Sequence, residues 1–338
     1  MINIKFLIKK LGYVNYGAFI RSAGRVSKLT HKPRALVLKD IMSCVVKHGS
    51  GYVDYEAYEM YNMDEKERSE FLTVGRNNTM VKELNKAEFR PYFEDKAIFN
   101  EKFSKYLKRD WMVLNGENFA EFEKFCDGKD AFFMKPLDQH SGFGIEKLYT
   151  SEIADLKAEY NRLYSQGCIL AEEVVTQCAE MNTLCTTSVN TIRLVTLLNK
   201  AGTKASVAAG AIRMGREGGF VDNFNHGGLA VILDVSKGES VTDGYDKERI
   251  TYIETPVLGT KLKGFKVPQW EECIKLVEEA ALVVPEVRYV AWDVCVSDKY
   301  GPLLIEGNSY PGQDVTQYPK LKLGTYAAFT KILEGLEK

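Results

Sequence analysis

The stretch that most constrains the fold of this chain is residues 289–314. Two apolar segments rich in β-branched residues flank a turn-forming Ser-Asp-Lys-Tyr-Gly-Pro sequence, a pattern that predicts a β-hairpin. Glu306 and Asn308 are two apart and would share a strand face, while Asp293 would lie beside them on the partner strand. Three hard oxygen side chains suit Mg²⁺, whose remaining ligands a substrate phosphate can supply. The alternative is an ordinary hairpin with a polar rim.

Composition limits the classes of function. The 338 residues are 45% hydrophobic and 27% charged, as in soluble globular proteins that form two or three packed subdomains. With 45 basic and 46 acidic residues, the chain has no global attraction to nucleic acid or to an anionic membrane. Its seven cysteines lack a CxxC spacing and favour reduced thiols in a cytosolic protein. With four histidines, none near a cysteine pair, no zinc site is expected.

The N-terminal residues 1–11 mix lysines into an apolar run that is too short for a signal-peptide core or a membrane span. They predict a first helix that packs on its own domain, with a weak amphipathic membrane contact as the alternative. No window reaches the roughly 18 uninterrupted apolar residues that a spanning helix needs. The sequence therefore predicts a cytoplasmic protein without stable membrane insertion.

Two lysines stand where an anion could bind. Asp95 is expected to cap a helix that begins at Lys96, where the helix dipole disfavours a cation, and this hints at an anionic partner. Lys135 ends an apolar strand and precedes a glycine-containing loop, whose backbone N–H groups could cradle phosphate oxygens. The loop residues considered as phosphate contacts are His140, Ser141, Gly142 and Gly144. A plain β-turn, a lysine without a role and an exposed loop histidine are the alternatives.

A further strand, within residues 167–177, ends in two carboxylates and an apolar pair. Such a crossing can offer backbone groups to an adenine edge, and the nearby Glu180 is the best-placed carboxylate for ribose hydroxyls. The candidate adenine contacts are Glu172, Glu173, Val174 and Val175. An edge strand with charged gatekeepers is the alternative.

Arginines mark two more predicted strands. Arg193 lies in the middle of an alternating strand, and a buried arginine needs an anionic or hydrogen-bonding partner, so a phosphate or carboxylate contact is favoured. Arg213 lies in the next predicted strand, Ala208 to Met214, which precedes a long glycine-rich polar loop, a kind of loop that is usually functional or disordered. We interpret it as a closing substrate loop with arginine clamps. Its candidate substrate contacts are Arg216, Asp222, Asn223, His226 and Gly227.

The order of these motifs resembles the ATP-grasp superfamily, most closely its branch associated with sugar transfer and polysaccharide biosynthesis, over about residues 93–315. The resemblance is carried by Asp95-Lys96, Met134-Lys135-Pro136, Leu170 to Gln177, Val189 to Arg193, Val221-Asp222-Asn223, His226-Gly227-Gly228, Trp292-Asp293 and Glu306-Gly307-Asn308. It implies a mixed α+β fold in which two α+β lobes clasp ATP. Residues 93–178 would form the small lobe with its lid, and residues 179–338 the central lobe with the Mg-ATP site. Residues 1–92 would add a mainly helical lobe.

The same resemblance implies roles for single residues. Lys96 and Lys135 would contact the ATP phosphates beneath a lid formed by the Gly142 and Gly144 loop, residues 171–175 would meet adenine, and Glu180 would hold ribose. Asp293, Glu306 and Asn308 would hold Mg²⁺, and Arg193 or Arg213 would face the γ-phosphate or the acceptor. Lys102 competes with Lys96 for the first lysine role, and the assignment among Glu172, Glu173 and Glu180 stays open.

The usual chemistry of the family is a two-step ligation through an acyl phosphate. The resemblance therefore implies a carboxylate–amine ligase that uses ATP and Mg²⁺ and acts on small molecules, with a saccharide- or peptide-linked metabolite as the expected kind of substrate. A kinase of a hydroxyl acceptor and a non-catalytic nucleotide-binding protein are the alternatives. No nucleic-acid partner is expected, and a homodimer is left open.

Overall fold

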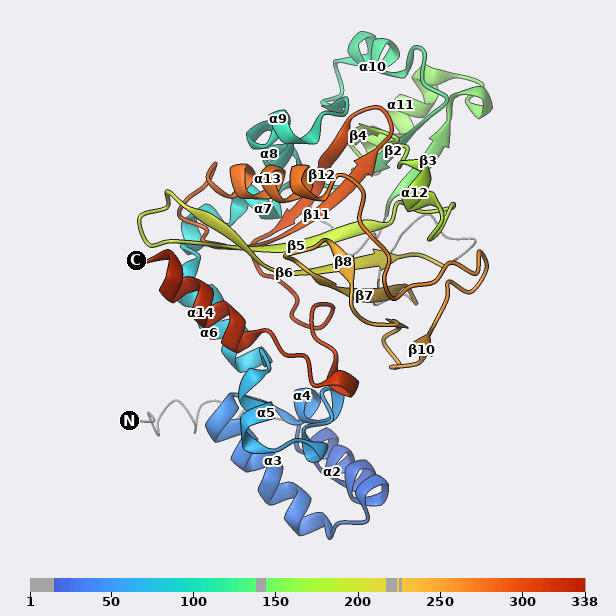
Figure 1. Ribbon diagram of the computed structural model, residues 1–338. Coiled ribbons are helices and arrows are strands. Elements are labelled where there is room, and N and C mark those ends of the chain that lie inside the picture. The colour runs from blue at the N-terminus through green and yellow to red at the C-terminus, as the bar shows by residue number, and fades with distance from the viewer. Residues whose placement is uncertain (1–14, 138–143, 217–223, 225–226, 338) are drawn as a thin grey trace. The chain divides into compact units, whose positions relative to one another are not determined.

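The computed structural model describes residues 15–137, 144–216, 224 and 227–337 (Figure 1). The chain divides into two compact units, one formed by Met1–Met80 with Gln317–Thr330 and the other by Val81–Thr316 with Lys331–Lys338. Helices and strands are both abundant, so the predicted mixed α+β class is confirmed. Within the described ranges, no helix combines the length and the apolar character that a bilayer crossing requires.

The first unit is helical. Its elements are α2 (Tyr16–Thr30), α3 (Arg34–His48), α4 (Tyr52–Ala57), η1 (Met60–Asn62), α5 (Glu65–Glu70), η5 (Pro319–Leu321) and parts of α6 (Val74–Leu84) and α14 (Tyr326–Leu336). Local sequence sets the helix ends, because Asn15 caps α2 and a reciprocal capping box joins Asp64 and Glu67 at α5. Ile41, Tyr55 and Phe71 belong to its buried core.

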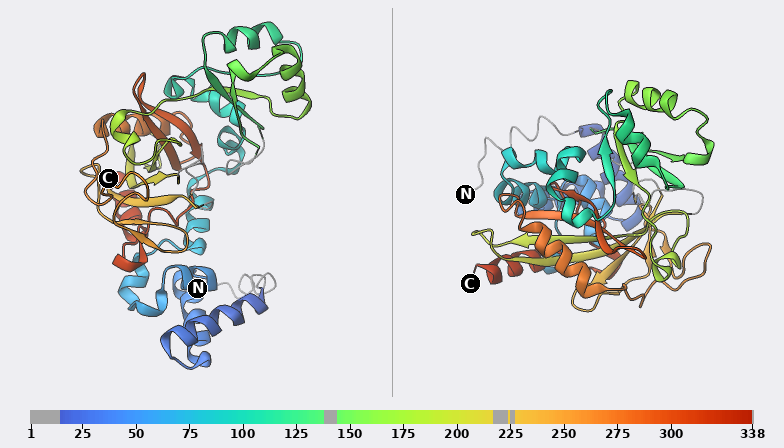
Figure 2. Two further views of the ribbon diagram at one scale, coloured as in Figure 1. Left: turned by 90° about the vertical axis from the view of Figure 1, so that its right-hand side faces the viewer. Right: turned by 90° about the horizontal axis from the view of Figure 1, so that it is seen from above.

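The second unit contains two sheets. The smaller sheet has the antiparallel order β1-β4-β2-β3, with β1 (Trp111–Val113), β2 (Ala131–Lys135), β3 (Glu146–Tyr149) and β4 (Leu170–Glu173). Helices α10 (Phe119–Cys126) and α11 (Leu156–Ser165) cover one of its faces (Figure 2). Phe122 and Leu163 of these helices share a core with Phe132 of β2.

The larger sheet has the order β10-β9-β7-β6-β5-β11-β12, and β8 pairs with β7. Its strands are β5 (Thr191–Leu198), β6 (Ala205–Met214), β7 (Leu229–Asp234), β8 (Glu239–Ser240), β9 (Gly244–Tyr245), β10 (Thr251–Tyr252), β11 (Tyr289–Ser297) and β12 (Gly301–Asn308). All of their pairings are antiparallel. Strands β11 and β12 form the hairpin that residues 289–314 predicted.

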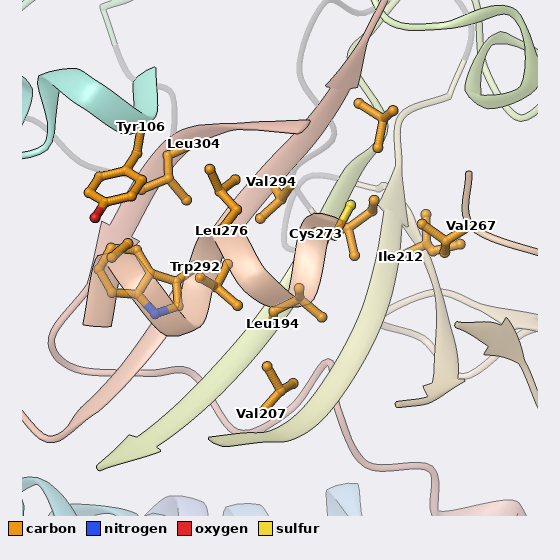
Figure 3. Packing of buried hydrophobic residues seen from close by; sticks show 14 of the residues in the cluster. Tyr106, Leu194, Val207, Ile212, Val267, Cys273, Leu276, Trp292, Val294 and Leu304 are labelled. Atoms are coloured by element: carbon orange, nitrogen blue, oxygen red, sulfur yellow. The ribbon is translucent and has the colours of Figure 1, made fainter. Parts of the chain in front are cut away.

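One face of the larger sheet forms the main core. Leu194 of β5 and Trp292 and Val294 of β11 lie on this face against Leu276 and Cys273 of helix α13 (Trp270–Ala281), as Figure 3 shows. The remaining helices of the unit are η2 (Ala87–Phe89), α7 (Pro91–Glu94), α8 (Lys96–Lys102), α9 (Ser104–Leu107), η3 (Thr150–Glu152) and α12 (Ala179–Asn182). Because side chains alternate along a strand, the residues between these core positions point to the opposite face.

A β-bulge in β12 decides which of its side chains reach that opposite face. Asp293 pairs with Glu306, but the next residue, Val294, pairs with Leu304, so Ile305 is an extra residue in β12. In a regular strand, Leu304 and Glu306 would share a face because they are two residues apart. The bulge lets Leu304 enter the core while Glu306 stays beside Asp293 on the other face.

Gly307 is expected to tolerate no side chain. A Cβ at this position would lie 2.9 Å from ring atoms of both Phe99 and Trp292. Gly307→Ala should therefore lower the free energy of unfolding by about 1–3 kcal/mol, the usual cost of overpacking. Urea unfolding followed by tryptophan fluorescence measures this unit, because Trp111, Trp270 and Trp292 all belong to it.

Gly335→Ala is the matched control for Gly307→Ala. An added Cβ there meets no heavy atom within 4 Å, and the residue lies in helix α14, so alanine should be neutral or slightly stabilising. Equal unfolding midpoints for the two variants would contradict the packing of Gly307 described above.

Asp54 in the helical unit is expected to make stability depend on pH. Burial raises the pKa of Asp54 to about 6, although its carboxylate accepts a 3.0 Å hydrogen bond from the Val74 N–H. In the unfolded chain the pKa of an aspartate is about 3.9. Because the folded unit holds the proton more tightly than the unfolded chain, its stability falls as the pH rises from about 4 to about 6. Asp54→Asn should stabilise the helical unit by about 1–3 kcal/mol at pH 7 and hardly at all at pH 3.5. Urea unfolding followed by circular dichroism at both pH values tests this, and an equal gain at both would contradict it.

Candidate functional site

Charged side chains form a row across four strands on the face of the larger sheet opposite to α13. Arg193 of β5 pairs in register with Asp293 of β11, which pairs with Glu306 of β12. Arg213 of β6 pairs with Thr191, two residues from Arg193, so both arginines share the face. The name charged row is used below for Arg213, Arg193, Asp293 and Glu306 together with the neutral Asn308, which follows Glu306 on β12.

Two arginines hold the centre of the charged row. The carboxylate of Asp293 is 1% exposed and accepts hydrogen bonds from Arg193 Nε at 2.5 Å and Arg193 Nη2 at 2.9 Å. Arg213 Nη2 donates to the same carboxylate at 2.8 Å and to the hydroxyl oxygen of Thr191 at 2.9 Å. A bidentate pair with a second cation fixes the orientation of both guanidinium groups.

The two carboxylates of the charged row differ in basicity. Burial alone would raise the pKa of Asp293, but the adjacent Arg193 and Arg213 outweigh it and lower this pKa to about 2. Glu306 keeps solvent access, yet desolvation by the surrounding protein and repulsion from Asp293 raise its pKa. A cation beside Glu306 would therefore relieve an existing repulsion.

The charged row can be tested as a magnesium site. Asn308 Nδ2 donates to Glu306 Oε1 at 3.3 Å, so the three predicted ligands lie together. The arginines occupy three of the roughly four lone-pair positions of Asp293. The donor set is nevertheless made of the hard oxygens that Mg²⁺ prefers. It fits Mg²⁺ chiefly through Glu306 and Asn308, with at most one oxygen from Asp293.

A second polar cluster surrounds Glu172 at the end of β4. Its buried carboxylate accepts hydrogen bonds from Asn100 Nδ2 at 2.7 Å, Arg109 Nη2 at 2.9 Å and Lys135 Nζ at 2.5 Å. Burial by itself raises the pKa of Glu172, but Arg109 and Lys135 hold it well below its usual range. Glu172 is thus an anion between two cations, and it positions Lys135.

Arg109 links this cluster to the bulge of β12. Its Nη1 donates to the carbonyl of Leu304 at 2.5 Å, and its Nη2 donates to the carbonyl of Ile305 at 3.2 Å. The guanidinium of Arg109 therefore connects Glu172, the partner of Lys135, to Ile305, the residue that precedes Glu306. The sequence signal for Arg109 is weak, because the Lys-Arg-Asp triplet at 108–110 looks like a solvated turn.

The structure also brings Lys96 to the segment that follows Lys135. Lys96 is the first residue of α8, capped by Asp95, and its Nζ donates to the carbonyls of Pro136 and Leu137 at 3.1 and 3.2 Å. Gly144 has a φ of +70°, a left-handed backbone conformation that favours glycine. The predicted contacts His140, Ser141 and Gly142 lie outside the described residues. Phosphate binding by Lys96, Lys135 and Gly144 stays a prediction.

The predicted adenine segment leads to a small apolar cluster beside the charged row. Val175 packs with Cys295 of β11 and Leu303 of β12, which lie on the same sheet face as Asp293. Glu173 accepts hydrogen bonds from Lys299 at 3.0 Å and from the Tyr300 hydroxyl at 2.9 Å. The half-buried Val174 follows β4, and Glu180 is exposed in the first turn of α12. The adenine and ribose roles stay predictions.

Arg216, a predicted substrate contact, lies two residues beyond the end of β6. Its Nη2 donates to Asp246 Oδ2 at 2.8 Å and to the Tyr252 hydroxyl at 3.0 Å. Gly227 has a φ of +94°. The other predicted contacts, Asp222, Asn223 and His226, lie outside the described residues. The acceptor roles of all these residues stay predictions.

Comparison with known proteins decides the family. The model of the family described as sugar-transfer associated ATP-grasp matches residues 75–322. The chain belongs to this ATP-grasp family. The resemblance drawn from the sequence motifs is thereby confirmed. A search of curated proteins returned no match for this ATP-grasp chain.

Several solved structures are similar to this ATP-grasp chain at low sequence identity. The D-alanine-D-alanine ligase from Coxiella burnetii is 13% identical with a TM-score of 0.40, over 72% of this chain and 57% of that one. The D-Ala:D-Ser ligase from Enterococcus faecalis is 15% identical with a TM-score of 0.41, over 72% and 62%. The L-amino acid ligase from Bacillus licheniformis is 12% identical with a TM-score of 0.39, over 66% and 42%. The chain thus spans less than two thirds of each of these proteins.

Glu172 should be essential to the stability of the ATP-grasp unit. Glu172→Gln would leave Arg109 and Lys135 without their anionic partner, and breaking a buried ion pair costs about 3–5 kcal/mol. Urea unfolding followed by tryptophan fluorescence measures the loss. Glu173→Gln is the matched control, because its partner Lys299 is 67% exposed and such pairs contribute about 1 kcal/mol or less. Similar losses for both variants would contradict the central role of Glu172.

Proposed function

We propose that this ATP-grasp protein is an ATP- and Mg²⁺-dependent carboxylate–amine ligase. The observation that carries the proposal is the charged row, in which a buried aspartate holds two arginines beside Glu306 and Asn308. Membership of the family supports ATP as a substrate. The acceptors would be a small-molecule carboxylate and an amine, on a saccharide- or peptide-linked substrate.

The polarity of the sheet face supports one orientation of ATP. The apolar cluster of Val175, Cys295 and Leu303 suits a base, and the neighbouring charged row suits phosphates. Lys135, at the end of β2, would contact the phosphates. Its ammonium group would either leave Glu172 or donate to Glu172 and to a phosphate oxygen together. Lys96, the loop around Gly144, residues 172–175 and Glu180 keep the roles that the resemblance implied.

Glu306 and Asn308, with one oxygen of Asp293, would hold Mg²⁺. The ion supplies positive charge that neutralises the phosphoryl group in transfer. The protein residues supply orientation. Asp293 accepts hydrogen bonds from Nε and Nη2 of Arg193. The Nη1 of Arg193 could then donate to a phosphoryl or carboxylate oxygen without a change in the orientation of the guanidinium.

The reaction would proceed in two displacements. A carboxylate oxygen of the acceptor attacks the γ-phosphorus of ATP, the bond to the β-phosphate oxygen breaks, and ADP leaves. The amine then attacks the acyl carbon, the bond from that carbon to the former carboxylate oxygen breaks, and inorganic phosphate leaves with this oxygen and takes up the proton that the amine nitrogen loses. Arg193 and Arg213 would stabilise the negative charge that develops on the transferred group and on the acyl oxygen.

The weak basicity of Asp293 favours a carboxylate acceptor over a hydroxyl acceptor if Glu306, the carboxylate with the raised pKa, is engaged by Mg²⁺ as proposed. A hydroxyl acceptor needs a general base, and effective bases have pKa values near the working pH. Asp293 has its pKa lowered to about 2, and both its oxygens accept hydrogen bonds from arginine. A carboxylate acceptor is already ionised at neutral pH, so the phosphoryl-transfer step to it needs no base.

The products of turnover test the proposal. With ATP, Mg²⁺ and a panel of carboxylic acids and amines, a ligase should release ADP and inorganic phosphate in an acid-dependent manner. ADP release with the phosphate retained on the product would identify a kinase. Nucleotide binding without acid-dependent turnover in any combination would favour a non-catalytic protein.

Glu306→Gln should lower ATP turnover by about 100-fold or more, because it removes the accessible carboxylate of the proposed magnesium site. Steady-state rates at several Mg²⁺ concentrations measure the effect. Glu272→Gln is the control, because Glu272 is an exposed acid on α13, which packs on the opposite face of the sheet. Turnover by Glu306→Gln equal to that of the control would overturn the metal assignment.

A further inference from the structure

The outer sides of helices α2 and α3 have no part in the proposed chemistry. The two helices are joined by residues 31–33 and lie side by side in the helical unit (Figure 1). Their inner sides pack together, because Ala23 and Val26 of α2 share a buried core with Val37 and Ile41 of α3. The outer sides face away from this core.

One stripe of α3 is exposed and largely apolar. Met42 and Val46 are 41% and 49% exposed, and Ala35 and Lys39 are exposed as well. The four residues follow the spacing i, i+4, i+7 and i+11, so they lie within about 60° of one another around the helix. Exposed aliphatic side chains that are scattered singly are normal, but these share one surface.

Arg34 joins this stripe to α2. Arg34 and Met42 are eight residues apart, so they lie on one row of α3. Arg34 Nη2 donates to the carbonyl of Ile20 at 2.5 Å and would lie 3.5 Å from a Cβ added to Gly24. Ile20, which is 46% exposed, begins a row of α2 that continues through Gly24 to Lys28. The outer sides of the two helices therefore meet at Arg34.

These rows form a surface that combines aliphatic and cationic side chains. The basic-apolar face consists of Ile20 and Lys28 of α2 and of Arg34, Lys39, Met42 and Val46 of α3.

The segment that carries the basic-apolar face is strongly basic. The lysines and arginines of residues 16–48 are Arg21, Arg25, Lys28, Lys32, Arg34, Lys39 and Lys47, and the one acidic residue is Asp40. Carboxylates pair with Arg25 and Lys47, but among the described residues none pairs with Lys28, Arg34 or Lys39. Positive charge is thus concentrated on this face, although the whole chain has a formal net charge of −1.

An anionic lipid surface matches this combination of side chains. The boundary between headgroups and acyl chains accepts aliphatic side chains, and anionic headgroups attract nearby lysines and arginines. Nucleic acid fits less well, because Ile20, Met42 and Val46 offer neither aromatic stacking nor hydrogen bonds to bases. A second copy also fits less well, since a two-fold axis through the face would bring like charges together.

We propose that the basic-apolar face binds the surface of an anionic lipid bilayer. Its aliphatic side chains enter the boundary between headgroups and acyl chains, and its cationic side chains contact headgroup phosphates. A net charge near zero does not oppose this contact, because salt screens charges that lie more than about 8–10 Å away and leaves the local field of the face. The proposal is independent of the ligase function.

Vesicle flotation of the full chain tests the face. Wild type should float with vesicles of phosphatidylcholine and phosphatidylglycerol and stay unbound with vesicles of phosphatidylcholine alone. Added salt should weaken the binding, because it screens the attraction. Lys39→Glu reverses a charge of the face, and Met42→Asp replaces an apolar contact by an anion. Each variant should weaken binding to the anionic vesicles about tenfold.

Lys124→Glu and Val257→Asp are the matched controls, because they make the same changes of charge at exposed positions of the other unit. Both should leave vesicle binding unchanged. Since all four replaced side chains are exposed, circular dichroism should show the same helix content in every variant as in wild type. Wild type that does not bind anionic vesicles, or controls that lose binding as much as Lys39→Glu and Met42→Asp, would overturn the proposal.

Two further measurements identify another occupant of the face. A dimer in sedimentation velocity that Met42→Asp dissociates, without vesicle binding by wild type, would overturn the proposal in favour of a second copy. Binding of a DNA duplex that Lys39→Glu weakens, again without vesicle binding, would overturn it in favour of nucleic acid. ATP turnover enters none of these measurements, so failure of the ligase proposal and failure of the membrane proposal remain distinguishable.

Discussion

The structure depends above all on the burial of Asp293 between two arginines. A carboxylate that is 1% exposed in the middle of a sheet is tolerated only because Arg193 and Arg213 compensate its charge and satisfy its oxygens. The three side chains come from three adjacent strands, so β5, β6 and β11 must keep their register for the charge to be matched. In return, both arginines are held in fixed orientations, and under the proposed function this would favour stabilisation of developing charge.

The β-bulge at Ile305 makes this arrangement compatible with a packed core. It turns Leu304 toward Trp292 and α13 and turns Glu306 toward Asp293, so one strand serves the core and the site at once. Arg109 donates to the carbonyls of Leu304 and Ile305 at the bulge and also holds Glu172. Through this one side chain, the position of Lys135 in the smaller sheet is coupled to the residue before Glu306 in the larger sheet.

Sequence reasoning worked where the signal is local. The alternation of apolar residues and the turn sequence predicted the β11–β12 hairpin, and Asp95 was recognised as the cap of α8. Arg193 stood out because an arginine among apolar neighbours needs a partner, and in the structure it pairs with Asp293, 100 residues away. Arg109 gave no such signal, since it lies among other charged residues in a turn. Its importance comes from burial and from partners, which only the fold supplies.

Periodicity, capping and motif order lie along the chain, so they were enough to predict the β11–β12 hairpin, the cap of α8 and the family. The tertiary structure decided which groups act together. It assigned most of the oxygen capacity of Asp293 to arginines and left Glu306 as the accessible carboxylate. The physical reason is that pairing, desolvation and register depend on residues brought together from distant parts of the sequence, and no local pattern encodes them.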